Sequence, residues 1–166
     1  MNKSYTTARM LIDGQLVESL DGGWLETNDP ADETPLGRVP SGSAADMAAA
    51  VAAAGRAQPA WAALPVAERV GYIRKLADGI SARAEEFAQI ESLDTGNTLG
   101  PMRKDVITAV ERMQFFCGLA YEMKGETIPG TTPNLHFTQR IPYGIVGRII
   151  PFNHPIGFAA ARLAPA

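Results

Sequence analysis

The chain has 166 residues, of which 46% are hydrophobic and 20% are charged, and its net charge is −3. These values are typical of a globular protein with room for about one domain, and they argue against nucleic acid or an anionic membrane surface as a main partner. The single cysteine excludes an internal disulfide. Because neither a secretory leader nor a membrane span is evident, we expect a cytoplasmic protein.

The first forty residues predict short strands. Residues 11–17 form a predicted hairpin, because apolar residues flank Asp13 and Gly14, a pair that favours a two-residue turn. Residues 24–27 and 36–39 are further strand candidates, and a turn-rich stretch separates them.

Three helices are predicted next. Ser43 is a suitable N-cap, and Asp46 three positions later favours a helix start. This alanine-rich helix is expected to end or kink at Pro59, and Pro65 is expected in the first turn of the second helix. Apolar residues then mark one face of each following helix, namely Val66, Val70, Ile73, Ala77 and Ile80, and then Phe87, Ile90 and Leu93 before Gly96.

A longer helix is predicted from Met102 to about Lys124. Cys117 lies on its apolar stripe, and a buried helical cysteine is usually an inert packing residue rather than a nucleophile. The stripe consists of Val106, Ala109, Val110, Met113, Phe116, Cys117, Ala120 and Met123.

The last part of the chain predicts two strands and a helix. Residues 135–141 alternate between apolar and polar, which indicates a strand with one exposed face. Residues 145–150 are mostly apolar on both faces, as in a buried parallel strand, and a helix is expected from Pro155. This order of elements predicts an α/β fold. A single parallel strand needs neighbours for its backbone groups, so we expect further sequence to complete the sheet.

Asn153 stands in the connection between the predicted strand and helix, between Pro151 and Pro155. A neutral amide at this place would lie at the carboxyl end of a buried strand, where open α/β sheets bind their ligands. The same residue also suits a simpler role, in which it bonds the turn backbone and caps the next helix. The residues alone favour the simpler role and leave both open.

Several motifs resemble, in order and spacing, the N-terminal part of the NAD(P)-dependent aldehyde dehydrogenases. The most specific is Pro142-x-Gly144-x-x-Gly147-x-x-x-Pro151-Phe152-Asn153-x-Pro155. The supporting motifs are Ile12-Asp13-Gly14, Asn28-Asp29-Pro30, Pro59-Ala60-Trp61, Glu91-Ser92-Leu93-Asp94-Thr95-Gly96 and Gly125-Glu126-Thr127-Ile128-Pro129. The family more often has Trp in place of Phe152 and Phe in place of His154.

The resemblance implies the helical layer and first strand of a Rossmann-like cofactor-binding domain, truncated before the rest of the sheet. Residues 1–133 would be the hairpin and helical layer. Residues 134–143 would be a bridging strand that serves oligomer formation, so the full-length parent would be a homo-oligomer. Residues 144–166 would be the first Rossmann-like strand and the start of the following helix.

The function implied by the resemblance is the oxidation of an aldehyde to a carboxylic acid with NAD or NADP. In such enzymes a cysteine thiolate attacks the aldehyde, a hydride passes to the cofactor, and a glutamate-activated water releases the acid. Asn153 would donate its amide N–H to the oxyanion that forms. The family's nucleophile and base lie far downstream of this motif, beyond Ala166, so we expect the chain alone to be inactive.

The resemblance also assigns the cofactor cleft to Ile149, Ile150, Pro151 and Phe152. For the two isoleucines, core packing remains an equal alternative, whereas the cleft is favoured for Phe152.

His154 is expected to fill an aromatic position, and the scattered histidines and the cysteine predict no metal site. A different class of function also stays open, namely a non-catalytic structural or interaction module that pairs with a partner through residues 134–141.

Overall fold

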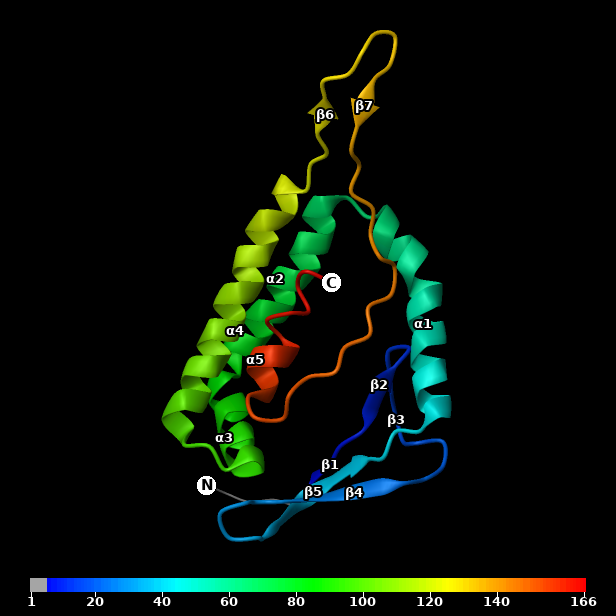
Figure 1. Cartoon of the computed structure of the whole chain (residues 1–166). Helices are drawn as coiled ribbons and strands as arrows, with labels where there is room; N and C mark the ends of the chain where they lie inside the picture. Colours follow the sequence, from blue (N-terminus) through cyan, green and yellow to red (C-terminus); the bar gives the residue numbers. More distant parts are fainter. Residues whose placement is uncertain (1–5) are drawn as a thin grey trace.

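The computed structural model describes residues 6–166, and it shows long helices standing beside small sheets (Figure 1). The α/β class expected from the sequence is confirmed. The strands are β1 (Thr6–Thr7), β2 (Met10–Ile12), β3 (Gln15–Val17), β4 (Trp24–Asn28), β5 (Pro35–Pro40), β6 (Thr127–Ile128) and β7 (His136–Phe137). The helices are α1 (Ala44–Ala63), α2 (Val66–Ala82), α3 (Ala84–Thr95), α4 (Leu99–Leu119), the 3-10 helix η1 (Ala120–Glu122) and α5 (Pro155–Ala159).

The predicted hairpin is confirmed as the antiparallel pair β2–β3. Its turn residues Asp13 and Gly14 have φ angles of 55° and 74°, which a two-residue turn of the primed type requires. Strand β4 pairs antiparallel with β5, and β5 also pairs parallel with β1. Strand β1 was not predicted, because two threonines carry no apolar alternation.

The start of α1 is fixed by Asp46, whose side chain is buried. Its carboxylate accepts hydrogen bonds from the backbone N–H of Ser43 at 2.8 Å, the hydroxyl of Ser19 at 2.7 Å and the backbone N–H of Leu20 at 3.0 Å. These bonds, that of the Ser43 N–H foremost, hold the pKa of Asp46 well below its usual range. The predicted N-cap at Ser43 is therefore confirmed, and Asp46 also ties the preceding loop to the helix.

Helix α1 continues past Pro59 to Ala63, so of the two outcomes predicted at Pro59, an end or a kink, the end is wrong. A proline inside a helix removes one backbone hydrogen bond, here to the carbonyl of Gly55. The loss is confined to one turn near the helix end. The Leu64 N–H then closes the last turn on the Trp61 carbonyl at 3.2 Å.

The core is built around α4, which α2, α3 and α5 all contact. Met102, Val106 and Met113 on this helix are completely buried. The predicted apolar stripe is confirmed from Val106 to Cys117, whereas its last member, Met123, lies beyond the helix and is 59% exposed. The helix begins at Leu99, three residues before the predicted start, and its last turn gives way to η1. Among the described residues, none of the helices combines the length and apolarity needed to cross a bilayer.

The buried face of α3 differs from the prediction. Ile90 is 55% exposed, whereas Ala88 and Glu91 are buried against the core. The helix is thus rotated so that a carboxylate, rather than an isoleucine, points inward. Its end at Gly96 is as predicted, with a φ of 73° that glycine adopts without strain.

The predicted strand at residues 135–141 is much shorter than expected. Only β7 forms, and it pairs antiparallel with β6 in a hairpin that projects beyond the helices (Figure 1). Leu135, Phe137 and Ile141 are 74%, 65% and 78% exposed, so the expected buried face is wrong for the described chain.

Residues 145–150 form no strand and are exposed, which corrects the prediction of a buried parallel strand. A strand needs partners on its edges, and within residues 6–166 no strand lies beside this segment. The helix predicted from Pro155 is confirmed as α5, and Ala160 and Ala161 just after it are buried in the core.

The exposed apolar side chains predict that the chain associates with itself. We expect oligomers in size-exclusion chromatography, together with binding of an apolar dye, because unpaired apolar segments promote association. Replacing Leu135, Phe137 and Ile141 with serine should reduce both signals. Leu20→Ser, at a loop residue 71% exposed, is the control and should change them little. A dye-negative monomer of the unmodified chain would contradict this expectation.

Candidate functional site

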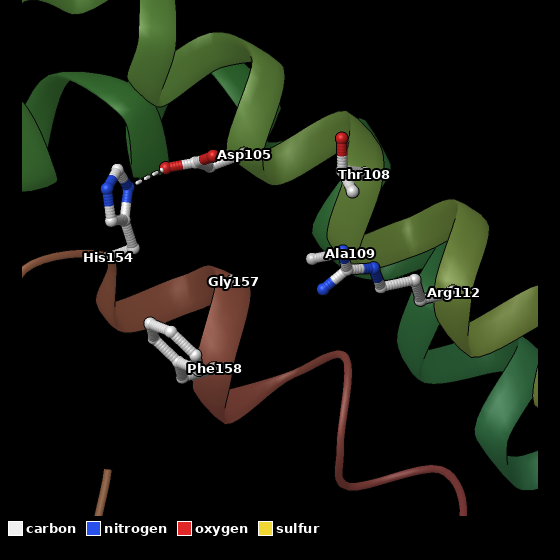
Figure 2. Close-up of a pocket in the computed structure, with 7 residues that line it drawn as sticks. All are labelled: Asp105, Thr108, Ala109, Arg112, His154, Gly157 and Phe158. Atoms are coloured by element: carbon white, nitrogen blue, oxygen red, sulfur yellow. Dashed lines mark hydrogen bonds and ion pairs between the residues drawn. The ribbon is translucent and has the colours of Figure 1, made fainter. Parts of the chain in front are cut away.

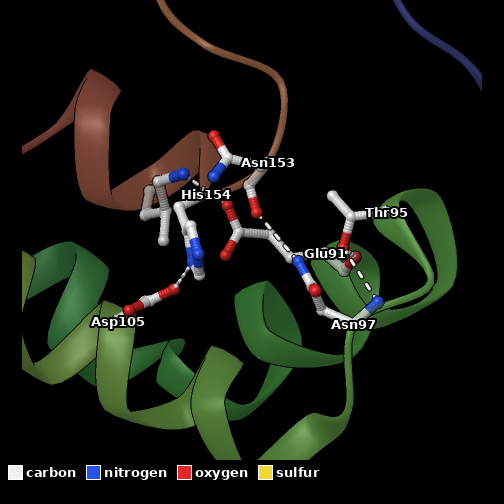
Figure 3. A network of polar contacts seen from close by, with 7 residues as sticks. Glu91, Thr95, Asn97, Asp105, Asn153 and His154 are labelled. Atoms are coloured by element: carbon white, nitrogen blue, oxygen red, sulfur yellow. Dashed lines mark hydrogen bonds and ion pairs between the residues drawn. The ribbon is translucent and has the colours of Figure 1, made fainter.

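Asn153 lies in the exposed turn that leads into α5. Its backbone oxygen accepts a hydrogen bond of 2.8 Å from the side-chain Nδ2 of Asn97 (Figure 3). Within residues 6–166 the side-chain amide of Asn153 makes no hydrogen bond of its own. The residue is therefore anchored through its main chain, and its amide is available to a ligand.

Two further contacts hold the same turn. The ring Nδ1 of His154 bonds the carboxylate of Asp105 on α4, and the backbone N–H of Ile156 donates to the carboxylate of Glu91 on α3 (Figure 3). All three contacts reach from residues 91–105 to residues 153–156. The sequence predicted His154 as a filler of an aromatic position, but it did not predict the pairing with Asp105.

Glu91 is the most unusual side chain at this site. It is 6% exposed, and its second carboxylate oxygen, Oε2, is buried without a hydrogen-bond partner. Burial raises the pKa of Glu91, and the hydrogen bond from the Ile156 N–H opposes the shift only in part. A buried carboxylate with an unsatisfied oxygen costs folding free energy.

The loop after α3 places Asn97 under the turn. Thr95 donates its hydroxyl to the Glu91 carbonyl at 2.7 Å, and the same hydroxyl accepts the backbone N–H of Asn97 at 3.3 Å. Ser92 donates to the Asn97 carbonyl at 2.7 Å. A side chain added at Gly96 would meet Pro30 at 3.3 Å, so the loop is confined from outside as well.

A small open cavity of about 160 Å³ lies between α4 and α5, beside the turn (Figure 2). The Asp105–His154 pair lies at one end and Arg112 at the other. Thr108, Ala109, Gly157 and Phe158 complete the lining. The cavity has room for a small group with a few polar atoms.

The residues predicted to line a cofactor cleft lie in the extended stretch before the turn. Ile149 is 100% exposed and Phe152 is 89% exposed, and Ile150 and Pro151 are exposed as well. None of them lines the cavity between α4 and α5. The described residues also contain no cluster of side chains suited to a metal ion.

Cys117 is a residue of α4, and its side chain is buried against α2. It is 3% exposed, and its Sγ is 4.0 Å from the Val70 carbonyl. Burial raises the pKa of this thiol, so the thiolate needed for nucleophilic attack is disfavoured. This is the packing role expected from its position on the helix stripe.

Sequence reasoning missed three residues that hold the turn, namely Glu91, Asn97 and Asp105. Glu91 offered one usable signal. It lies four residues after Phe87 and three after Ala88, so it occupies a position where an apolar side chain would complete the helix face. Asn97 and Asp105 offered none, because a polar residue in a loop or early in a helix is ordinary.

Glu91 predicts a pH-dependent stability. The folded-state pKa lies above the unfolded value of 4.5, so the folded state binds more protons between the two values, and stability falls as the pH rises through this window. Glu91→Gln keeps an acceptor and removes the charge. It should therefore raise the melting temperature at pH 7 and lose this advantage near pH 4.5. An advantage that is equal at both pH values would contradict the raised pKa.

Cys117 predicts a slow thiol reaction. The native chain should react with a thiol reagent at least about tenfold more slowly than the chain in denaturant, because access requires opening of the core. Cys117→Ser should lower the free energy of unfolding by about 1–3 kcal/mol, since a hydroxyl enters an apolar site. Rapid modification of the folded chain would show that the thiol is accessible.

Comparison with known proteins gives one consistent result. The profile of the Aldehyde dehydrogenase family matches residues 17–166. Aldehyde dehydrogenase tropH of Talaromyces stipitatus is 35% identical over 158 residues, which cover 93% of this chain and 31% of the relative. The mitochondrial methylmalonate-semialdehyde/malonate-semialdehyde dehydrogenase [acylating] of Rattus norvegicus is 34% identical over 155 residues, covering 93% of this chain and 29% of that protein.

Solved structures agree. PnpE, in a crystal structure with nicotinamide adenine dinucleotide, has a TM-score of 0.91 and 39% identity over 95% of this chain and 33% of its own. A crystal structure of PnpE from Pseudomonas sp. WBC-3 has a TM-score of 0.88 and 39% identity over 93% of this chain and 32% of its own. An NAD-dependent aldehyde dehydrogenase from Sinorhizobium meliloti has a TM-score of 0.72 and 32% identity over 76% of this chain and 26% of its own. The chain spans about a third of the length of these relatives, and it belongs to the aldehyde dehydrogenase family.

Proposed function

We propose that this chain is the N-terminal part of an enzyme that oxidises an aldehyde to a carboxylic acid with NAD or NADP, and that Asn153 is its oxyanion donor. One observation carries the proposal. The Asn153 turn is bonded through its backbone, while its side-chain amide has no partner within residues 6–166. In a residue that only caps a turn, the side-chain amide would form hydrogen bonds to the neighbouring backbone.

The chemistry required of Asn153 follows from the charge that develops. When a nucleophile adds to an aldehyde, the carbonyl oxygen becomes an oxyanion, and a neutral N–H donor fixed beside it stabilises the charge. A carboxylate in the same place would repel the oxyanion. Cys117 cannot serve as the nucleophile, because it is buried in the core.

The residues before Asn153 suit one wall of a cofactor site. Ile149 and Phe152 present exposed apolar surface against which a planar ring could pack, with Ile150 and Pro151 between them. NAD(P)+, when bound, accepts the hydride released in the oxidation. The exposed apolar stretch fits this role as a packing surface, while hydrogen bonds to phosphate and ribose would come from other parts of the protein.

The full-length enzyme is further proposed to be a homo-oligomer, with the β6–β7 hairpin and residues 134–143 at the interface. The exposed Leu135 and Phe137 on the projecting hairpin support this arrangement. The same surface would serve a non-catalytic interaction module, which remains the second candidate. The cytoplasmic location stays a prediction, since a matched relative is mitochondrial.

The test uses a chimera in which this chain replaces the matched part of the tropH aldehyde dehydrogenase. In an active chimera, Asn153→Ala should lower kcat/KM by about 10²–10³-fold, because one preorganised donor to the oxyanion is lost. Gln114→Ala, at an exposed residue of α4, is the control and should leave the rate unchanged.

Two outcomes would count against the proposal. A near-normal kcat/KM for Asn153→Ala would show that this residue only caps the turn and does not donate to the oxyanion. Aldehyde-dependent reduction of NAD+ or NADP+ by the 166-residue chain alone, absent from mock purifications, would show that a nucleophile other than the buried cysteine operates.

A further inference from the structure

We infer that Glu91 and Asn97 are positioning residues for Asn153, which hold the backbone of its turn so that its side-chain amide keeps one direction. The inference rests on the proposed oxyanion role of Asn153. It adds two residues that need not touch the substrate and that act through the turn.

The two contacts bracket the turn at its two ends. Asn97 Nδ2 donates to the backbone oxygen of Asn153 at 2.8 Å, and the Glu91 carboxylate accepts the backbone N–H of Ile156 (Figure 3). The direction of a side chain is set by its backbone. Fixing the peptide oxygen at one end and an N–H three residues later therefore limits how the Asn153 amide can swing.

Local structure alone does not supply this rigidity. The residue that caps α5, His154, makes no side-chain hydrogen bond to the first turn of the helix, and the segment before Asn153 has no regular structure. The two contacts instead span 56 and 65 residues of sequence. The turn is thus held by α3 and the loop that follows it, in addition to the bond between His154 and Asp105 of α4.

The folding free energy that is lost by burying the Glu91 carboxylate supports a role beyond packing. The residue occupies a buried position of α3, its Oε2 lacks a partner, and an apolar side chain there would avoid the loss of carboxylate hydration. Departures from the rules of stable packing tend to mark functional sites. The carboxylate provides what an apolar residue cannot, namely an acceptor for the Ile156 N–H.

At Asn97, the contact to the turn can be removed by substitution while the contacts that place the loop remain. Its side chain bonds the Asn153 oxygen, while its place in the loop is set by backbone contacts to Thr95 and Ser92. Asn97→Ala therefore removes one hydrogen bond to the turn. Asn97→Asp keeps the shape, but at neutral pH it has no N–H to donate.

The first measurement uses the 166-residue chain and hydrogen–deuterium exchange of residues 153–160. Glu91→Ala should speed exchange of the Ile156 amide by about tenfold or more, because its acceptor is lost. Glu91→Gln, which keeps an acceptor, should stay within about threefold of the unmodified chain. Glu111→Ala, at an exposed residue of α4, is the control and should have no effect. Unchanged Ile156 exchange in Glu91→Ala overturns the inference for Glu91, whether or not the chimera is active.

The second measurement uses the tropH chimera. Asn97→Ala, Asn97→Asp and Glu91→Ala should each lower kcat by about 10- to 100-fold with KM nearly unchanged, since a misplaced donor weakens the transition state rather than substrate binding. Glu91→Gln should retain most of the rate. A purely structural role would instead lower the amount of folded enzyme without changing kcat per active site.

Double substitutions separate this inference from the proposed function. If Asn97 acts through Asn153, Asn97→Ala should cost almost nothing further in the Asn153→Ala background. Full additivity of the two losses would overturn positioning while leaving the oxyanion role of Asn153 intact. A normal rate for Asn153→Ala would instead remove the proposed function itself.

Discussion

The packing of helix α4 is the constraint on which the described fold depends. Met102, Val106 and Met113 are fully buried on this helix, and burial of each such side chain contributes about 1.5–3 kcal/mol. Helices α2, α3 and α5 all dock on α4. Because α3 and α5 share this support, the loop at Asn97 and the turn at Asn153 meet, although 56 residues separate them. The candidate site is thus a consequence of helix packing.

The stretch before Asn153, unlike the helices, does not pack into the core. Residues 145–150 are apolar enough for a core, yet they are exposed and without regular structure. A helix satisfies its backbone hydrogen bonds within itself, whereas a strand depends on neighbours. Helices α2 to α4 therefore form within residues 6–166, and this segment does not become a strand. The same dependence explains why only two residues of the predicted strand at 135–141 are paired.

The sequence allowed prediction where structure is set locally. The Asp13–Gly14 turn, the Ser43 cap and the stripe of α4 depend on residues a few positions apart, and all three were predicted. The inward face of α3 was not predicted, because a glutamate is normally exposed and its place on the apolar face of the helix was the one signal that it is buried. The pairing of His154 with Asp105 spans 49 residues and depends on how helices dock. The residues alone singled out Asn153 and left two roles open for it, and the oxyanion role predicted for it came from the family motif.

Around Asn153, contacts to the main chain fix the turn, and the side-chain amide is left to donate to a ligand. A donor to a developing charge contributes most when its direction is fixed before the reaction, since no reorganisation is then needed. A side chain fixed by its own hydrogen bonds could not also serve a ligand, so the restraint has to act on the backbone. The contact at the Asn153 oxygen meets this requirement, as does the one at the Ile156 N–H. Burial of the Glu91 carboxylate then lowers the stability of the fold in exchange for a rigid turn. The residue that causes this loss lies away from the reacting atoms.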